Sequence, residues 1–183
     1  MKKFIISLFI IAGIFLFGTN AFAVGKYGPN WEKQVIKVYI PEDSYSGMMQ
    51  RAFQKWVDQC NGRLKFEFIT TPPADIEVEF AEKTDGTDGD IGSYALTVKG
   101  GAITHATITM APNPTMNSND LIYTVMLHEI GHALGLRDSS RKLGIMATPV
   151  TSQQDIIYTD VYRLYQVNGW AYVEKSAPAN VSE

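Results

Sequence analysis

The sequence predicts an α+β domain in which helices pack on one twisted, mixed β-sheet. Three observations support this class. Most stretches in which apolar and polar residues alternate, as in strands with one wet face, occur before residue 111, around a single helical pattern. Two further helical patterns follow after residue 117. No internal repeat and no long linker divides the chain, so one domain is expected.

The first half of the chain predicts a strand, a helix and two more strands. The segment VIKVYI at residues 35–40 is apolar and β-branched, which is typical of a strand. Ser44 or Ser46 can cap a helix that carries apolar residues on one face and ends near residue 59. Alternation of apolar and charged residues then predicts strands at 64–68 and 76–80.

A hairpin follows a loop that is rich in aspartate and glycine. The loop EKTDGTDGDIG, residues 82–92, is a candidate calcium (Ca²⁺) site, because hard cations prefer clustered carboxylate and carbonyl oxygens. It lacks the ordered ligand spacing of an EF-hand, and a solvated turn is the alternative. Strands are expected at residues 94–98 and 103–110, joined by a Lys-Gly-Gly turn.

The last part of the chain predicts two helices. Ser118 or Asp120 can cap a helix whose apolar residues occupy more than one side, so we expect this helix to be buried. Gly135 is placed to end it, because glycine favours the left-handed conformation that follows many helices. A final helix is expected over about residues 153–167.

The two ends of the chain differ in composition from the expected domain. Residues 1–23 contain two lysines, an apolar run and a final Ala-Phe-Ala, the parts of a secretory signal peptide; an uncleaved membrane anchor is the alternative. Cleavage there leaves a domain at residues 24–173 and a tail at 174–183 that we expect to be disordered. We therefore expect a secreted or periplasmic protein with no membrane attachment after cleavage.

Charge and cysteine content narrow the function classes. The formal net charge is −3 and no basic run is present, so neither nucleic acid nor anionic lipid is expected as a partner. Cys60 is the only cysteine, which excludes a disulfide within the chain. Its thiol is either reactive, as a nucleophile or metal-blocking group, or a small buried group at a helix end.

The stretch HEIGHALGLRD, residues 128–138, carries the chemistry. His128 and His132 are four residues apart, so on a helix their imidazoles lie on one face and can bind one zinc ion (Zn²⁺). Glu129 is offset from them, close enough to take a proton from a metal-activated water as general base. Two histidines and a glutamate are costly to bury on an apolar helix without partners, which favours a site over chance.

A third protein ligand is needed, and four residues are candidates. Asp138 is favoured because Gly135 lets the chain turn back toward the histidines, and a carboxylate is a good zinc ligand. The other candidates are His105 on a predicted strand and Asp155 and Asp160 on the last predicted helix.

These residues resemble the extended zinc motif of the metzincin peptidases, with aspartate in the last ligand position as in the small bacterial snapalysin-like enzymes. The segment GIMATP at 144–149 is similar to the metzincin Met-turn, with Met146 as its methionine below the zinc ligands. The resemblance implies a metzincin-like fold: a twisted mixed sheet, an active-site helix, a helix packed on the sheet and a C-terminal helix.

Most of the predicted domain also resembles the catalytic domain of the matrixins (matrix metallopeptidases). This resemblance implies that the strand at 103–110 is the edge strand of the cleft, which binds peptides in extended form. Two family features are missing: the histidines of a second, structural zinc site, and room for a cysteine-bearing propeptide before the first strand. One catalytic zinc is therefore expected.

The sequence thus predicts a secreted, monomeric zinc metalloendopeptidase that hydrolyses peptide bonds of peptide or protein substrates. Zinc would be held by His128, His132 and Asp138, and Glu129 would activate the attacking water. No serine or cysteine nucleophile is expected. The alternative is a non-catalytic metzincin-like module that keeps zinc for structure and binds peptides or proteins without cutting them.

Overall fold

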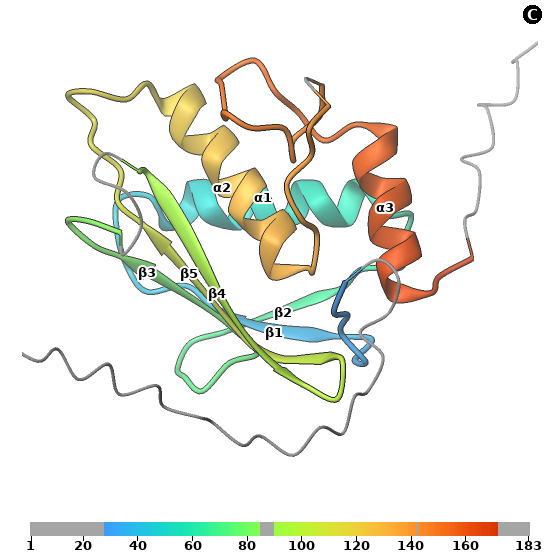
Figure 1. Ribbon diagram of the computed structural model, residues 1–183. Coiled ribbons are helices and arrows are strands. Elements are labelled where there is room, and N and C mark those ends of the chain that lie inside the picture. The colour runs from blue at the N-terminus through green and yellow to red at the C-terminus, as the bar shows by residue number, and fades with distance from the viewer. Residues whose placement is uncertain (1–27, 85–89, 142, 172–183) are drawn as a thin grey trace, which may run out of the picture.

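The computed structural model describes residues 28–84, 90–141 and 143–171 (Figure 1). They form five strands in one sheet and three helices, which confirms the predicted α+β class. The elements are β1 (Ile36–Tyr39), α1 (Ser46–Gln59), β2 (Phe66–Ile69), β3 (Ile76–Phe80), β4 (Gly92–Lys99), β5 (Ala102–Met110), α2 (Asn119–Ala133) and α3 (Tyr158–Asn168).

Three predictions fall on residues outside the described ranges. The signal peptide at residues 1–23 and the tail at 174–183 lie entirely outside them. The candidate calcium loop lies partly outside them, because residues 85–89 are not described. Among the described residues, none of the three helices combines the length and the apolar character that a membrane span requires.

The sheet is mixed, and its strand order is β2-β1-β3-β5-β4. Strand β1 pairs in parallel with β2 and β3, β3 pairs in parallel with β5, and only β4 runs antiparallel to its neighbour β5. The edge strand beside the site is therefore β4, and the expectation that residues 103–110 form it is wrong. Strand β5 uses both of its hydrogen-bonding sides, which places it inside the sheet.

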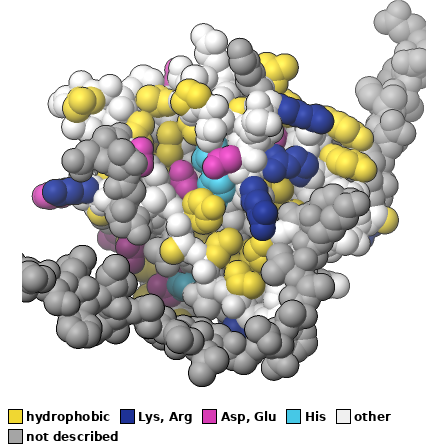
Figure 2. All heavy atoms as spheres, viewed as in Figure 1, with side chains coloured by type: hydrophobic (Ala, Val, Ile, Leu, Met, Phe, Trp, Pro, Cys, Tyr) yellow, Lys and Arg dark blue, Asp and Glu magenta, His cyan; other side chains and the backbone are white. Residues whose placement is uncertain are grey.

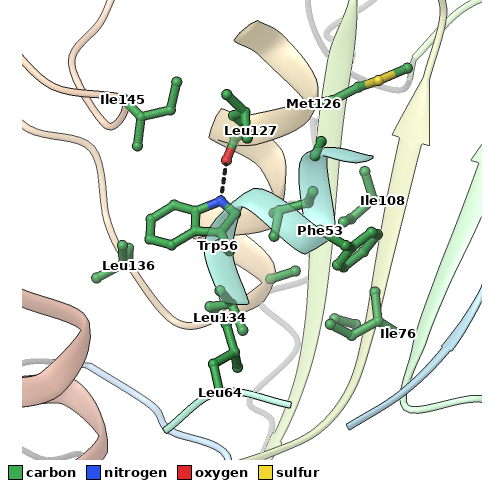
Figure 3. Packing of buried hydrophobic residues seen from close by; sticks show 14 of the residues in the cluster. Phe53, Trp56, Leu64, Ile76, Ile108, Met126, Leu127, Leu134, Leu136 and Ile145 are labelled. Carbon is green, nitrogen blue, oxygen red and sulfur yellow. Dashed lines mark hydrogen bonds between the residues drawn. The ribbon is translucent and has the colours of Figure 1, made fainter. Parts of the chain in front are cut away.

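Helices α1 and α2 lie on the same side of the sheet, and one tryptophan joins them (Figures 1 and 3). The indole Nε1–H of Trp56, on α1, donates to the carbonyl of Leu127, on α2, at 3.0 Å. Trp56 and Phe53 are both fully buried, and replacing such a residue by alanine typically costs about 3–5 kcal/mol. A second indole, that of Trp31, donates to Ala133 O at 2.9 Å and fixes the end of α2.

Both ends of α2 are capped. Ser118 is the N-cap residue, and its hydroxyl accepts from Leu121 N at 3.2 Å. At the other end Gly135 has φ 95°, and Leu136 N donates to Gly131 O at 3.0 Å while Gly135 N donates to His132 O at 2.8 Å. This pair of bonds is a Schellman motif, so α2 ends where the sequence predicts.

Helix α3 begins at Tyr158, five residues later than predicted. Residues 151–154 form a turn in which Gln154 N donates to Thr151 O at 3.2 Å and Thr151 N donates to Gln154 Oε1 at 3.1 Å. The carboxylate of Asp160 accepts from Ile157 N at 3.1 Å and so stabilises the helix start. Local side-chain bonds therefore compete successfully with helix formation before residue 158.

Cys60 is a buried residue at the end of α1. Its side chain is fully buried, and this burial raises the pKa of the thiol to about 12. The thiol is therefore protonated at neutral pH. The backbone carbonyl of Cys60 accepts a hydrogen bond from the Tyr165 hydroxyl at 2.8 Å, which ties α1 to α3. The structure agrees with the packing role and gives no support to a reactive thiol.

Candidate metal centre

Helix α2 brings the imidazoles of His128 and His132 together. They lie one turn apart, both are buried, and their Nε2 atoms are 3.0 Å apart. The Nδ1–H of His128 donates to Ile145 O at 2.7 Å, and the Nδ1–H of His132 donates to Leu136 O at 2.9 Å. Because a carbonyl only accepts, each Nδ1 carries the proton, and in the neutral rings both Nε2 atoms present lone pairs to one another. Such a pair is stable with a cation between the nitrogens.

The turn after α2 adds Asp138 to the two histidines. Its Oδ1 atom lies 3.3 Å from His128 Nε2 and 3.3 Å from His132 Nε2. The same Schellman turn that redirects the chain also presents Leu136 O to His132, so one local structure orients two members of the group. Ser139 N donates to Met146 O at 2.6 Å and fixes the next part of the loop.

The three atoms fit a tetrahedral zinc ion. Zinc bonds of about 2.0–2.2 Å at a tetrahedral angle place ligand atoms about 3.3 Å apart. The observed separations of 3.0, 3.3 and 3.3 Å match this value closely. Burial and the neighbouring His128 lower the pKa of His132 to about 4, which keeps it in the neutral form that binds metal. In the described part of the chain, no other group of three histidine, cysteine or carboxylate ligands converges in this way.

The other candidates for third ligand lie elsewhere. His105 Nδ1 pairs with Ala74 O at 3.2 Å on the sheet, and Asp155 forms an ion pair with Lys55 at 2.7 Å. Asp160 is 2% exposed, and its carboxylate accepts from Ile145 N at 2.9 Å. Since Ile145 O in turn holds His128, Asp160 supports the site from behind and does not reach the ligand group.

Glu129 lies beside the ligands in a poorly solvated position. It is 6% exposed, and its Oε2 atom is buried without a hydrogen-bond partner. Burial first, then the negative charges of Asp138 and Asp90, raise the pKa of this carboxyl to about 8. A cation held by the three ligands opposes this shift, because a nearby positive charge favours the ionised carboxylate. Glu129 is thus a group whose proton affinity depends on the metal.

Met146 lies against α2 at Gly131, which stands between the two histidines in the sequence. It is fully buried, and a Cβ placed on Gly131 would overlap its Sδ atom. Glycine at position 131 therefore lets the segment carrying Met146 approach the helix directly. This arrangement agrees with a methionine packed under the ligand-bearing turn of the helix.

Two residues near the site lie outside the His-Glu-x-x-His motif and are not predicted from the sequence. The ring of Tyr94, on β4, stacks on His132 with centroids 4.1 Å apart and an angle of 14° between the planes. Gly92, at the start of β4, lies directly against the helix, since an added Cβ would lie 2.7 Å from Val125 Cγ1 and 2.8 Å from Glu129 Cγ. Both depend on how β4 crosses α2, which local sequence does not encode.

A cavity of about 520 Å³ adjoins the ligand group. Its floor is α2, including Leu121 and Val125; one wall is β4 with the residues just before it, and the other is the segment 148–150. Figure 2 shows the histidine and carboxylate side chains at the centre of this exposed face. The cavity therefore opens beside Glu129 and the ligands and is partly apolar, as ligand sites commonly are.

Fold and site together define a metallopeptidase-type centre: a buried helix with the His-Glu-x-x-His pattern, a third ligand after a glycine turn, and a mixed sheet beside the cleft. The family model described as Matrixin matches residues 31–166. The chain belongs to the matrixin family of zinc metalloendopeptidases.

Individual relatives agree with this assignment. The chain is 34% identical over 140 residues to the macrophage metalloelastase of Oryctolagus cuniculus, covering 64% of this chain and 28% of the relative. It is 28% identical over 174 residues to metalloendoproteinase 1 of Glycine max, covering 76% of this chain and 54% of the relative. The matches thus span about a quarter to about half of the length of these curated relatives.

Proposed function

We propose that this chain is a secreted zinc-dependent endopeptidase in which His128, His132 and Asp138 hold the metal and Glu129 is the general base. The observation that carries the proposal is the convergence of three ligand atoms, 3.0–3.3 Å apart, beside a buried carboxylate with an unpartnered oxygen. Export rests on the leader-like composition of residues 1–23.

The bound zinc would act as a Lewis acid, polarising the scissile carbonyl and lowering the pKa of the attacking water. The side chains and carbonyls of the site would transfer the proton and orient the ligands. Glu129 accepts the proton of that water on its unpartnered Oε2 and returns it to the leaving amine. The imidazole orientations are held by Ile145 O and Leu136 O, so the ligands need not reorganise.

The substrate would bind as an extended chain along β4. This strand pairs only with β5 in the described sheet, so its other side offers backbone groups to a peptide. The cavity between α2 and residues 148–150 would take the side chain next to the scissile bond. Its apolar lining by Leu121, Val125 and Val150 favours a hydrophobic side chain there.

Asp138 as third ligand has a consequence for acidity. An anionic carboxylate leaves the metal less positive than a neutral imidazole does, so the water is acidified less. We therefore propose a snapalysin-like centre with a higher pH optimum than a three-histidine relative.

The test is cleavage of a mixed peptide library by zinc-loaded protein, residues 24–183, with Glu129→Ala in parallel. We expect cuts only with intact Glu129 and equal zinc content in both proteins. Cleavage that survives Glu129→Ala would remove the general-base role. A folded, zinc-bearing protein that cuts nothing would favour the non-catalytic binding module instead.

A further inference from the structure

A second hollow lies directly beside the metal centre. It has a volume of about 510 Å³, and it forms where the loop after Asp138 meets the first turns of α3. Asp138 lines this hollow and also the cavity beside Glu129, so the two spaces share a wall. The two spaces therefore adjoin at this candidate ligand.

This hollow is basic, although the whole chain is acidic. We use the name arginine rim for Arg141 and Arg163; the chain contains three further arginines, and its formal net charge is −3. Arg141 and Arg163 line the hollow, whose single acidic lining residue, Asp138, is turned toward the two histidines. In Figure 2, dark blue side chains gather on one side of the histidine and carboxylate side chains.

Arg163 is held in place with part of its donor capacity unused. Its Nη2–H donates to Arg137 O at 2.7 Å, which fixes the plane of the guanidinium. Its Nη1 atom is buried and has no hydrogen-bond partner. The guanidinium is thus fixed beside the hollow that Arg163 lines, where its positive charge favours a negatively charged side chain.

Two tyrosines complete the hollow with flat, partly apolar walls. Tyr158 is 63% exposed and Tyr162 is 41% exposed, and their rings stack with centroids 6.0 Å apart. Exposed large aromatic residues beside arginine are characteristic of surfaces that bind protein chains. The composition suits the apolar stem and the charged end of a glutamate side chain.

We propose, building on the endopeptidase function above, that the arginine rim is a substrate subsite for acidic residues a few positions from the scissile bond. An extended chain advances about 3.3 Å per residue. Because both spaces adjoin at Asp138, a substrate residue in the arginine rim would be only a few positions from the residue in the cavity beside Glu129. One guanidinium can bind a carboxylate by two parallel hydrogen bonds, which lysine does not reproduce.

The experiment compares cleavage of matched peptides that differ only in charge. Each peptide carries the same cleavable core, with Glu, Gln or Lys scanned through the flanking positions, and kcat/KM is measured for each. We expect glutamate at one or two positions to raise kcat/KM about fivefold to tenfold over glutamine, the range of one or two partly exposed ion pairs. Raising the salt from about 0.1 M to about 1 M should reduce this ratio.

The variants Arg141→Gln and Arg163→Gln should bring the Glu/Gln ratio close to one. Arg51→Gln is the matched control, because Arg51 is exposed on α1 and lines neither space; it should keep the ratio. Arg163→Gln loses the bond to Arg137 O and can weaken folding. Arg141 is exposed, so Arg141→Gln tests the subsite without that complication. A ratio near one in the unaltered protein, or one that survives both substitutions, would overturn the subsite.

A binding assay separates this proposal from the proposed function. Fluorescence anisotropy measures binding of the best Glu peptide and its Gln twin to zinc-loaded Glu129→Ala protein, which needs no turnover. Tighter binding of the Glu peptide that is lost in Arg141→Gln supports the subsite even where no peptide is cut. Equal binding of the twins overturns it, whatever the outcome of the cleavage assay.

Discussion

Replacing Glu129 by glutamine should change how the stability of the metal-free protein depends on pH. Burial and the charges of Asp138 and Asp90 raise the pKa of Glu129 from 4.5 to about 8 in the folded protein. The folded state therefore holds a proton that the unfolded state releases at neutral pH. Stability from this group is fully present below about pH 4.5 and is lost as pH rises toward 8.

The titration of His132 makes stability rise with pH, which is opposite to the effect of Glu129, and it does so at lower pH. Its pKa falls from 6.5 to about 4 on folding, mainly because of burial and then because of His128. Its contribution is present above pH 6.5 and is lost as pH falls toward 4. Between about pH 4.5 and 6.5 the two slopes oppose each other, whereas between 6.5 and 8 the slope of Glu129 remains.

The size of the stability change follows from proton linkage. One proton of difference changes the unfolding free energy by about 1.4 kcal/mol per pH unit. We therefore expect metal-free protein to lose roughly 1–2 kcal/mol of stability between pH 6.5 and 8. Glu129→Gln should keep a nearly constant stability in this window, because glutamine does not titrate.

The assay is urea unfolding of chelator-treated protein at several pH values, followed by circular dichroism. The unaltered protein with saturating zinc is the second control, and its slope should be smaller because the cation lowers the pKa of Glu129. A flat profile for the unaltered metal-free protein, or an equal slope in Glu129→Gln, would refute the reasoning.

Three further predictions concern the metal and its surroundings. Asp138→Ala should weaken zinc binding by more than about 100-fold in a chelator competition titration, and unchanged affinity would exclude Asp138 as a ligand. Asp138→His should retain zinc and move the pH optimum of cleavage downward. Gly131→Ala should lower the unfolding free energy by about 1–3 kcal/mol, because the added Cβ overlaps Met146 Sδ. Adding Met146→Ala to this variant should remove the clash. If the two substitutions show purely additive losses in thermal unfolding, the contact is contradicted. Tyr94→Leu should reduce stability by about 0.5–1.5 kcal/mol through loss of the ring stack on His132, and an unchanged melting temperature would argue against it.

Elements with strong local patterns were predictable, and so was the group of candidate ligands. The spacing of His128 and His132 on an apolar helix, followed by Gly135, was enough to infer that Asp138 returns to the histidines, because each step is set by helix geometry and one turn. The Schellman bonds show how a glycine at this place redirects the chain.

What the sequence did not predict depends on contacts between distant segments. The sequence offers Asp160 only as an alternative metal ligand on the last predicted helix, but its carboxylate is buried and accepts from Ile145 N, fifteen residues away. The stack of Tyr94 on His132 and the edge position of β4 follow from how the sheet crosses α2. Local periodicity carries no information about that crossing.

The two indole bonds to α2 have a consequence for how the protein can be observed. Trp31 and Trp56 are 4% and 0% exposed, and each donates its N–H to a carbonyl of the helix that carries the histidines. Their ultraviolet emission is therefore that of shielded, hydrogen-bonded indoles, and it moves to longer wavelength when water reaches them. The chain contains one other tryptophan, so two of its three indoles lie beside the helix that carries the histidines. The molecule thus carries an intrinsic optical reporter of the helix that holds His128 and His132.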